Sequence, residues 1–418
     1  MERSSLSLAP TSPSPDLQRL RDEGYAVSLV AGHLVVSDIP FADADRKVSR
    51  GRLMVPLDMV GDRTAAPTRH DAFWSGGAPC DQDGIPLSSL ITMPLVHDLG
   101  SGLSSDHHLC NMPVGREFSD YHELVLAYVA LISGHVSALD PMATARGRRR
   151  TVAAENPLTP FNYVDTATSR AGVGALTSRL EGGRIGIVGL GGSGSYVLDL
   201  VAKTPVSHIH LFDGDVFLQH NAFRAPGAAT LAEIGARRAK VDHFASVYSR
   251  MHRGIVPHRV KLEGVHLRLL DHVDFAFLCI DDSVSKRPVI ERLERNGTAF
   301  VDLGMGLEVT EAGILGAVRV TTSTDSMRSH VRDGHRLPFA AGGSPDAYET
   351  NVQVADLNAL NAALAVIKWK RLRGFYAQGA GEHHCIFNID GNQLLNADEL
   401  HPAVAAKRQS EPRSSDVG

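Results

Sequence analysis

The chain has 418 residues, and its 47 acidic and 42 basic side chains give a formal net charge of −5 with histidine neutral. This length exceeds what one hydrophobic core usually stabilises, so more than one domain is expected. The weakly acidic balance argues against nucleic acid as the main partner, and no apolar run is long enough to cross a membrane.

Composition divides the chain into four parts. A Ser/Pro-rich tail at 1–15 is expected to be disordered, and an α+β domain with a basic linker at its end is predicted for 16–150. A larger α/β domain is predicted for 151–400, followed by a polar tail at 401–418. The start of the chain lacks the apolar core of a secretory signal, and its few cysteines suit a reducing compartment. We therefore expect a cytoplasmic protein.

The N-terminal domain begins with residues 25–41, whose apolar residues predict two short strands around a glycine turn. Residues 120–136 place apolar side chains at helical spacing and predict an amphipathic helix. Together they indicate a small α+β module.

A glycine-rich turn opens the second domain. The apolar run Ile185–Val188 predicts a buried strand, and Gly189, Gly191 and Gly194 then give the G-x-G-x-x-G spacing before a predicted helix at 195–202. Such glycines allow a tight turn, a close approach of the backbone to phosphate and packing of the helix on the strand. The helix N-terminus then faces the anion, so a nucleotide is the expected ligand.

Polar residues follow the next predicted strands. Asp213 ends the strand at 209–212, about twenty residues past the turn, where this fold holds a ribose hydroxyl. Asp215, Asn221 and Arg224 come next, Lys240 lies in a predicted helix at 236–250, and Asp281 ends the apolar strand FAFLCID. The glycine turn and Asp213 by themselves are equally compatible with NAD and with ATP as the bound nucleotide. The cations favour a triphosphate with Mg²⁺, because transfer of an adenylyl group requires its charge to be neutralised.

The C-terminal part of this domain is predicted to contain a strong helix at 351–375, which is rich in Ala and Leu and ends in Lys and Arg. Residues 383–395 then predict a hairpin with an Asp-Gly turn. Cys80, Cys110, Cys279 and Cys385 form no C-x-x-C pair, so a structural zinc site is not expected.

From about residue 165 to 375 these motifs resemble the ThiF/MoeB/HesA family, the adenylating fold shared with ubiquitin-activating enzymes. The resemblance implies a Rossmann-like doubly wound sheet, a homodimer, and ATP and Mg²⁺ as cofactors. It also implies adenylation of the C-terminal carboxylate of a ubiquitin-like or sulfur-carrier protein. Catalysis would rest mostly on positioning and charge neutralisation.

The resemblance also assigns roles to residues. Asp213 would hold the ribose, Asp281 would hold Mg²⁺, and Arg170, before the first strand, would reach into the partner subunit's site. Those that would bind the nucleotide are Gly189, Gly191, Gly192, Gly194, Asp213, Asp215, Asn221, Arg224 and Lys240, and those with a catalytic role are Arg170, Arg224, Lys240 and Asp281.

Relatives that pass the substrate onward as a thioester carry a cysteine in a crossover loop, which here would be residues 321–350 and holds none. Three acceptors of the acyl group stay open: another protein by direct handover, which we favour, the hydroxyl of Ser344, or the thiol of Cys385. A serine nucleophile needs a base, and His330 and His335 lie in the same loop.

In the N-terminal domain, residues 69–90 loosely resemble the segment around the active cysteine of ubiquitin-conjugating enzymes. Ile85, Pro86 and Leu87 follow Gly84 here, where the resemblance would require a cysteine, and Cys80 precedes the turn. We therefore expect a module that docks a ubiquitin-like or conjugating-enzyme-like partner rather than a catalytic one.

The prediction is thus an ATP-dependent adenylyltransferase in a bacterial ubiquitin-like conjugation pathway. Two alternatives remain: a catalytically silent nucleotide-binding scaffold and an NAD-dependent oxidoreductase. Each of these residues could also have a structural role instead of binding a nucleotide. Asp213 could cap a turn, Asn221 could be a turn residue, and Lys240 could lie on a solvated helix face. The oxidoreductase leaves Asn221, Arg224 and Lys240 unexplained.

Overall fold

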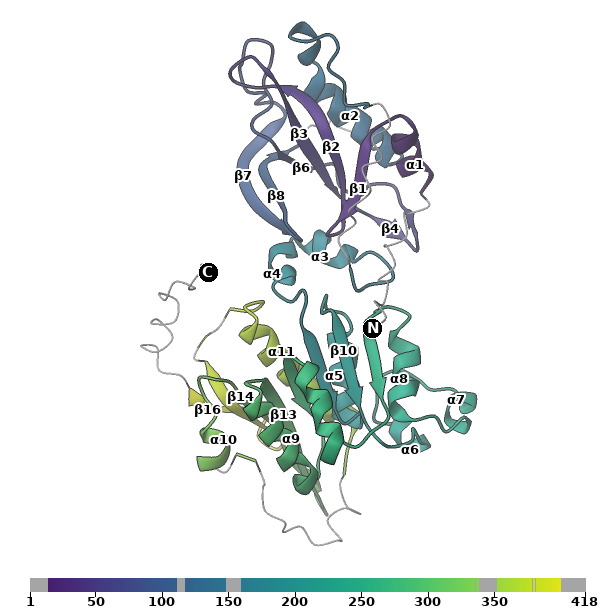
Figure 1. Ribbon diagram of the computed structural model, residues 1–418, viewed down its shortest axis with the longest axis vertical. Coiled ribbons are helices and arrows are strands. Elements are labelled where there is room, and N and C mark those ends of the chain that lie inside the picture. The colour runs from purple at the N-terminus through teal and green to yellow at the C-terminus, as the bar shows by residue number, and fades with distance from the viewer. Residues whose placement is uncertain are drawn as a thin grey trace. The chain divides into compact units, whose positions relative to one another are not determined.

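The computed structural model describes residues 14–110, 117–147, 159–334, 336–337, 352–377, 379 and 381–399. The chain forms two compact units, one that ends at Ser178 and one that begins at Arg179 (Figure 1). The boundary predicted between residues 150 and 151 and the tail predicted at 401–418 lie outside the described residues, as does the tail predicted at 1–15 up to position 13. None of the described helices combines the length and apolar character needed to span a membrane.

The N-terminal unit is built on a six-stranded antiparallel sheet. Its strands lie in the order β1 (Ala26–Val30), β2 (His33–Ala42), β3 (Val48–Pro56), β6 (Ala72–Ser75), β8 (Leu103–Leu109) and β7 (Ile91–Gly100). β1 and β2 are the two strands predicted around the glycine turn, and Gly32 takes a φ of +73° there. A separate small hairpin pairs β4 (Met59–Val60) with β5 (Arg63–Thr64).

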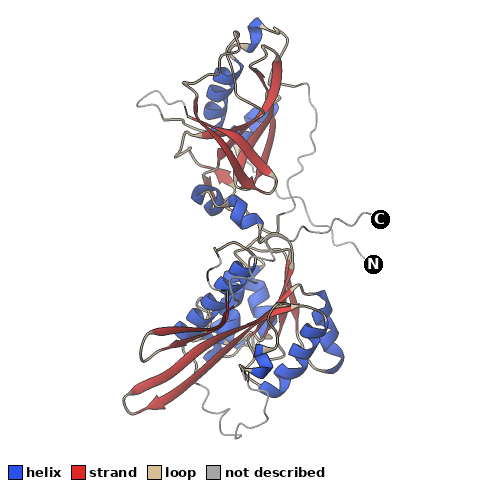
Figure 2. Cartoon of the chain, turned by 90° about the vertical axis from the view of Figure 1, so that its left-hand side faces the viewer, coloured by secondary structure: helices blue, strands red, loops and turns tan. Residues whose placement is uncertain are grey.

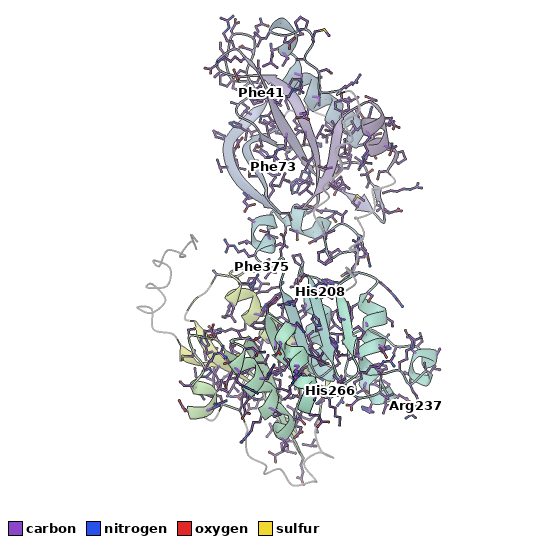
Figure 3. The ribbon with its side chains drawn as sticks, in the orientation of Figure 1. Phe41, Phe73, His208, Arg237, His266 and Phe375 are labelled. Carbon is purple, nitrogen blue, oxygen red and sulfur yellow. The ribbon has the colours of Figure 1, made fainter. Side chains whose placement is uncertain are left out.

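Helices cover one face of this sheet. α1 (Pro15–Asp22) and the predicted helix α2 (Tyr121–Ser133) pack their apolar side chains against β2 and β3. Phe41 belongs to this core, whereas Phe73 packs against a smaller apolar cluster that includes Val35 and Met54 (Figure 3). A short 3₁₀ turn, η1 (Val136–Ala138), and the helices α3 (Thr166–Ala171) and α4 (Gly174–Ser178) complete the unit.

The C-terminal unit contains an eight-stranded mixed sheet. Five strands are parallel, in the order β11 (Ile255–His258), β10 (His208–Phe212), β9 (Arg184–Val188), β12 (Phe275–Leu278) and β13 (Ala299–Thr310). The sheet continues antiparallel through β14 (Gly313–Ser323), β15 (Glu382–Asn388) and β16 (Gln393–Glu399), and long paired strands reach beyond the helices in Figure 2. The hairpin predicted at 383–395 is β15–β16.

Helices cover both faces of the parallel part. α5 (Gly192–Val201), α8 (Lys240–Tyr248) and α11 (Ala355–Leu372) share one apolar core with the sheet. α9 (Ser283–Arg295) and the 3₁₀ helix η2 (Gly264–His272) share a second core with it. The short helices are α6 (Gln219–Ala222), α7 (Leu231–Gly235) and α10 (His330–Asp333). This arrangement confirms the predicted doubly wound α/β fold.

β13 runs on to Thr310, but the register of the other four parallel strands, β11, β10, β9 and β12, brings their carboxyl ends to one level. Val188 of β9 pairs with Phe212 of β10 and with Leu278 of β12, and Leu278 pairs with Asp302 of β13. The segments that leave these strands therefore start side by side at one edge of the sheet, where ligands bind in open α/β folds.

A buried ion-pair network ties α9 to β13 and β14. Asp302 is fully buried, and its Oδ1 lies 2.6 Å from Lys286 Nζ while its Oδ2 accepts a hydrogen bond of 2.8 Å from Arg319. Lys286 is only 3% exposed. Its ammonium group forms an ion pair with Asp302 Oδ1 but is not aligned for a hydrogen bond to that oxygen. One carboxylate thus balances two cations from two elements.

We expect Asp302→Asn to destabilise the C-terminal unit by about 3–5 kcal/mol, because it leaves buried cations without their counterion. Denaturant unfolding followed by the fluorescence of Trp369, in a Trp74→Phe background, would measure this change. Lys203→Ala, which breaks the exposed pair with Asp199, is the matched control and should cost no more than about 0.5 kcal/mol. Equal effects of the two substitutions would contradict the assignment.

Candidate functional site

A cavity of about 440 Å³ lies at the edge of the sheet where the parallel strands end. Its wall includes the glycine turn after β9, the segment after β10, the start of α8 and the segment after β12. Eight of the residues predicted from the sequence line it: Gly189, Gly191, Gly192, Asp213, Asp215, Arg224, Lys240 and Asp281. The fold therefore brings most of the predicted site together around one space.

The glycine turn forms because its residues have no side chains. Gly189 takes a φ of +89°, and a Cβ added at Gly194 would lie 1.9 Å from the carbonyl oxygen of Gly189. Gly194 therefore lets α5 approach the turn, although it does not itself line the cavity. A Cβ at Gly191 would meet no atom within 4 Å, so the space beside it is open. The N-terminus of α5 begins there and can receive an anion.

The acidic residues after β10 are held by the turn and by Lys240. Asp213 Oδ2 accepts a 2.7 Å hydrogen bond from the Leu190 amide, and Lys240 Nζ donates a 2.8 Å hydrogen bond to Asp215. Lys240 is 7% exposed and is the first residue of α8. The hydrogen bond from Lys240 lowers the pKa of Asp215, so that carboxylate stays ionised at neutral pH.

Asn221 and Arg224 lie on either side of the end of α6. Asn221 is buried, and its Oδ1 accepts a hydrogen bond from the Leu218 amide, which orients the side chain. Among the described residues, Asn221 Nδ2 and Arg224 Nε have no hydrogen-bond partner although both atoms are buried. Arg224 lines the cavity and Asn221 does not. Unsatisfied buried donors beside a cavity are what an anionic ligand would use.

Two aspartates follow β12 with different roles. Asp282 caps α9, because its side chain accepts hydrogen bonds from the amides of Val284 and Ser285. Asp281 lines the cavity, and its Oδ2 accepts a 3.0 Å hydrogen bond from Gln353. Both aspartates line the cavity, but the carboxylate of Asp282 accepts from the first amides of α9, whereas that of Asp281 accepts from the side chain of Gln353.

Residues 166–336 match the model of the ThiF family, and residues 15–166 match a model described as "Domain of unknown function (DUF6791)". The chain carries a ThiF-family domain. The match to the ThiF model confirms the family that the motifs indicated. The second match shows that the N-terminal part corresponds to a separate domain family, one whose function is not defined. None of the curated proteins compared with the chain matches it.

Solved structures also match the chain, at low sequence identity and with TM-scores below 0.5. Escherichia coli MccB, in a crystal structure with ATP, is 13% identical over 56% of this chain and 70% of its own, with a TM-score of 0.42. MccB with MccA is 12% identical over 56% of this chain and 69% of its own, with a TM-score of 0.44. PaaA is 14% identical over 54% of this chain and 75% of its own, with a TM-score of 0.41.

Arg170 lies in the N-terminal unit rather than in the unit that holds the cavity. It belongs to α3, its side chain is 62% exposed, and its Nη1 lies 3.5 Å from Asp58 Oδ1. The role of Arg170 in a partner subunit's site stays a prediction.

The cysteines of the ThiF domain are poor nucleophiles. Cys279 follows β12, lines the cavity and packs against the apolar core, and its burial raises the pKa of the thiol far above neutral pH. Burial also raises the pKa of Cys385, which lies on β15, three strands from β12 and so roughly 14 Å across the sheet. Ser344 and His335 lie outside the described residues.

The conjugating-enzyme-like segment of the N-terminal unit presents no reactive thiol. Cys80 is fully buried, and desolvation raises the pKa of its thiol. Gly84 takes a φ of +83° in the turn, and the exposed Ile85 and Pro86 follow it. The docking role expected of this segment stays a prediction.

Several residues that line the cavity were not anticipated, among them a lysine and three amide side chains. Lys261 lies near Asp215 and helps to lower the pKa of that carboxyl. The amides are Gln353, just before α11, and Asn358 and Asn361 in its first two turns. The asparagines are 1% exposed and three residues apart in an Ala- and Leu-rich helix, where asparagine is a weak helix former. That spacing was the signal available in the sequence.

Gly191→Ala should weaken ATP binding by roughly tenfold, because the new methyl group would stand in the space left for the ligand, and overpacking costs about 1–3 kcal/mol. Its melting temperature should stay within about 2 °C of the wild type, since the methyl group meets no protein atom. Calorimetric titration with ATP and a thermal melt would measure both.

Gly194→Ala is the comparison, because its Cβ would collide with the Gly189 carbonyl. It should lower the melting temperature by several degrees. Unchanged ATP affinity in Gly191→Ala would show that the ligand does not approach the turn.

Proposed function

We propose that this chain is an ATP-dependent adenylyltransferase that activates the C-terminal carboxylate of a ubiquitin-like or sulfur-carrier protein. The observation that carries the proposal is the cavity itself, where a glycine turn, the cations Arg224 and Lys240 and the carboxylate of Asp281 face one space. Membership of the ThiF family supports the adenylating activity, because that is the chemistry the family resemblance implies.

In the proposed reaction a carboxylate oxygen of the substrate attacks the α-phosphorus of ATP. The new bond joins that oxygen to phosphorus, the bond to the bridging oxygen of the β-phosphate breaks, and pyrophosphate leaves with its electron pair. The turn and the α5 N-terminus bind phosphate oxygens, while Arg224 and Lys240 neutralise the charge that develops. Asp213 and its neighbours orient the ribose.

Mg²⁺ fits this site in chemical terms, since it prefers oxygen ligands and is commonly bound by one or two carboxylates together with substrate phosphates. Asp281 would supply the carboxylate. When bound, the ion would neutralise phosphate charge and favour departure of pyrophosphate. Asp281 would also hold Gln353 in place through the hydrogen bond already present.

We place the chain in a bacterial ubiquitin-like conjugation pathway, as a homodimer, with the N-terminal unit docking a ubiquitin-like or conjugating-enzyme-like partner. The high thiol pKa values of Cys279 and Cys385 favour direct handover of the acyl group to another protein. Transfer of the acyl group to the hydroxyl of Ser344, with release of AMP, is the competing route. The unpartnered cationic donor Arg224 Nε argues against the NAD-dependent oxidoreductase, which has less need of cations at this position.

The test is ATP–pyrophosphate exchange with a panel of ubiquitin-like and sulfur-carrier proteins. We expect exchange that requires one carrier and falls by about 10²–10³-fold in Lys240→Ala, as when a preorganised charge-stabilising group is removed. Asp281→Ala should reduce exchange as well. Lys203→Ala removes an exposed lysine outside the cavity and should leave the rate unchanged.

Tight ATP binding without exchange for any carrier would identify a silent scaffold instead. Preferential binding of NAD would identify the oxidoreductase. Exchange that persists in Lys240→Ala would refute the role given to that lysine.

A further inference from the structure

A hydroxyl, an imidazole and a carboxylate form one hydrogen-bonded chain in the N-terminal unit. Thr92 Oγ1 lies 2.7 Å from His108 Nδ1, and His108 Nε2 lies 3.1 Å from Asp71 Oδ2. A hydroxyl held to a base, with the base held to an orienting carboxylate, is the arrangement that activates a hydroxyl for attack on a carbonyl carbon. These three side chains therefore have the composition and the contacts of a nucleophilic site.

Asp71 determines which nitrogen of His108 carries the proton. Its carboxylate is held by Arg69, whose Nε and Nη2 donate hydrogen bonds of 2.9 and 2.8 Å to its two oxygens. Burial opposes ionisation, but hydrogen bonds from Arg69 and His108 lower the pKa of Asp71, so this group is an anion at neutral pH. A carboxylate anion only accepts hydrogen bonds. In the neutral imidazole the hydrogen thus lies on Nε2, and Nδ1 keeps a lone pair that faces Thr92.

An irregularity in β7 brings the hydroxyl of Thr92 to that lone pair. β7 is the edge strand of its sheet, and its pairing with β8 shifts register between Ile91 and Met93, so Thr92 occupies a bulge. Bulges redirect a side chain and are frequent beside active sites. Thr92 is exposed, whereas the side chains of His108 and Asp71 are 22% and 15% exposed. A substrate can therefore reach the hydroxyl, while its base is mostly buried.

The hydroxyl of Thr92 has one proton and two acceptors within reach. The carbonyl oxygen of His108 lies at 3.0 Å and the ring Nδ1 at 2.7 Å. A hydrogen bond to the carbonyl would only fasten β7 to β8, whereas the closer ring nitrogen can also take the proton away. The ring of His108 meets Phe73 (Figure 3) edge to face, with 5.5 Å between centroids, which restricts its rotation.

We propose that Thr92 is a nucleophile that takes an activated acyl group from a mixed anhydride or a thioester, with His108 as its general base and Asp71 as the group that orients the imidazole. Thr92 Oγ1 attacks the acyl carbon and forms an ester. The bond from that carbon to the leaving oxygen or sulfur breaks, and the leaving group departs with the electron pair. The hydroxyl proton passes to His108 Nδ1, and the Asp71 carboxylate balances the imidazolium. This activity goes beyond the proposed adenylation, whose product is one such anhydride.

The first probe is para-nitrophenyl acetate, an activated ester that requires no nucleotide site. The intact chain should release nitrophenolate in a burst that approaches one equivalent, and mass spectrometry should place the acetyl group on residue 92. Thr92→Val, which keeps the shape of the side chain and removes the hydroxyl, should lose this adduct, and Thr92→Ser should keep it. His108→Gln should slow its formation by roughly 10²-fold, as for the loss of a general base.

Thr68→Val is the matched control, because Thr68 is an exposed threonine of the same unit whose hydroxyl donates to the carboxylate of Asp58 rather than to an imidazole. It should leave the burst and the adduct unchanged. The Thr92 pair decides the question even where His108→Gln does not fold. No adduct on residue 92 of the wild type, or acylation that is equally fast in folded His108→Gln, would overturn the inference and leave the three side chains a structural role.

Acetylglycyl-AMP and the thioester of acetylglycine with N-acetylcysteamine distinguish the two donors. Acyl transfer to Thr92 from the adenylate would place this residue directly after adenylation, and transfer from the thioester alone would place it after handover to another protein. Either result supports the inference, and transfer from neither donor would overturn it. ATP–pyrophosphate exchange by the same chain reports separately on the nucleotide site. Exchange without an adduct would remove the Thr92 site and leave the adenylation standing, and an adduct without exchange would do the reverse.

Discussion

The contact between α5 and the turn that precedes it fixes the geometry of the whole candidate site. A single methyl group at Gly194 would lie 1.9 Å from the Gly189 carbonyl, so this packing exists only because the residue has no side chain. With α5 held there, its first amides face the space beyond β9. The same position of α5 places Gly192 and Ser193 against Asn358 of α11, a residue 165 positions away in the chain.

Charge is distributed unevenly around the cavity. On the side of β10 and α8, Lys240 lies between Asp213 and Asp215, and Arg224 approaches with a donor left unpaired. On the side of β13 and α11, the wall is uncharged and combines amide side chains with Leu303, Gly304 and Met305. A ligand with an anionic middle and a neutral, hydrogen-bonding end matches this division. ATP bound together with a peptide carboxylate is such a ligand, whereas a dinucleotide leaves the amide wall without a clear purpose.

Much of the fold followed from local pattern. The strand before the glycine turn, the helix α11 and the β15–β16 hairpin were predicted from apolar periodicity and turn residues, because these are short-range properties. The ends of two helices differ from those predicted. The helix predicted at 236–250 begins only at Lys240, since Arg237 (Figure 3) takes a φ of +46° that a helix cannot contain. Likewise α5 starts at Gly192 rather than at residue 195.

The cationic half of the site could be predicted because its residues follow successive strands whose carboxyl ends must meet. The amide half could not. Asn358 and Asn361 stand in a helix far along the chain, and only tertiary packing of α11 on α5 and β13 brings them to the cavity. The phosphate contact of Asn221 stays a prediction: its Oδ1 accepts a hydrogen bond from the Leu218 amide, its Nδ2 has no partner among the described residues, and it does not line the cavity.

The most direct test of the central claim is a calorimetric titration of the intact chain with ATP and, separately, with NAD, each in the presence of Mg²⁺. A cavity built for a triphosphate predicts that ATP binds the more tightly and that Arg224→Ala weakens ATP while leaving any weak NAD binding unchanged. Tighter binding of NAD, or ATP affinity that Arg224→Ala does not alter, would contradict the assignment of this cavity to an adenylating site.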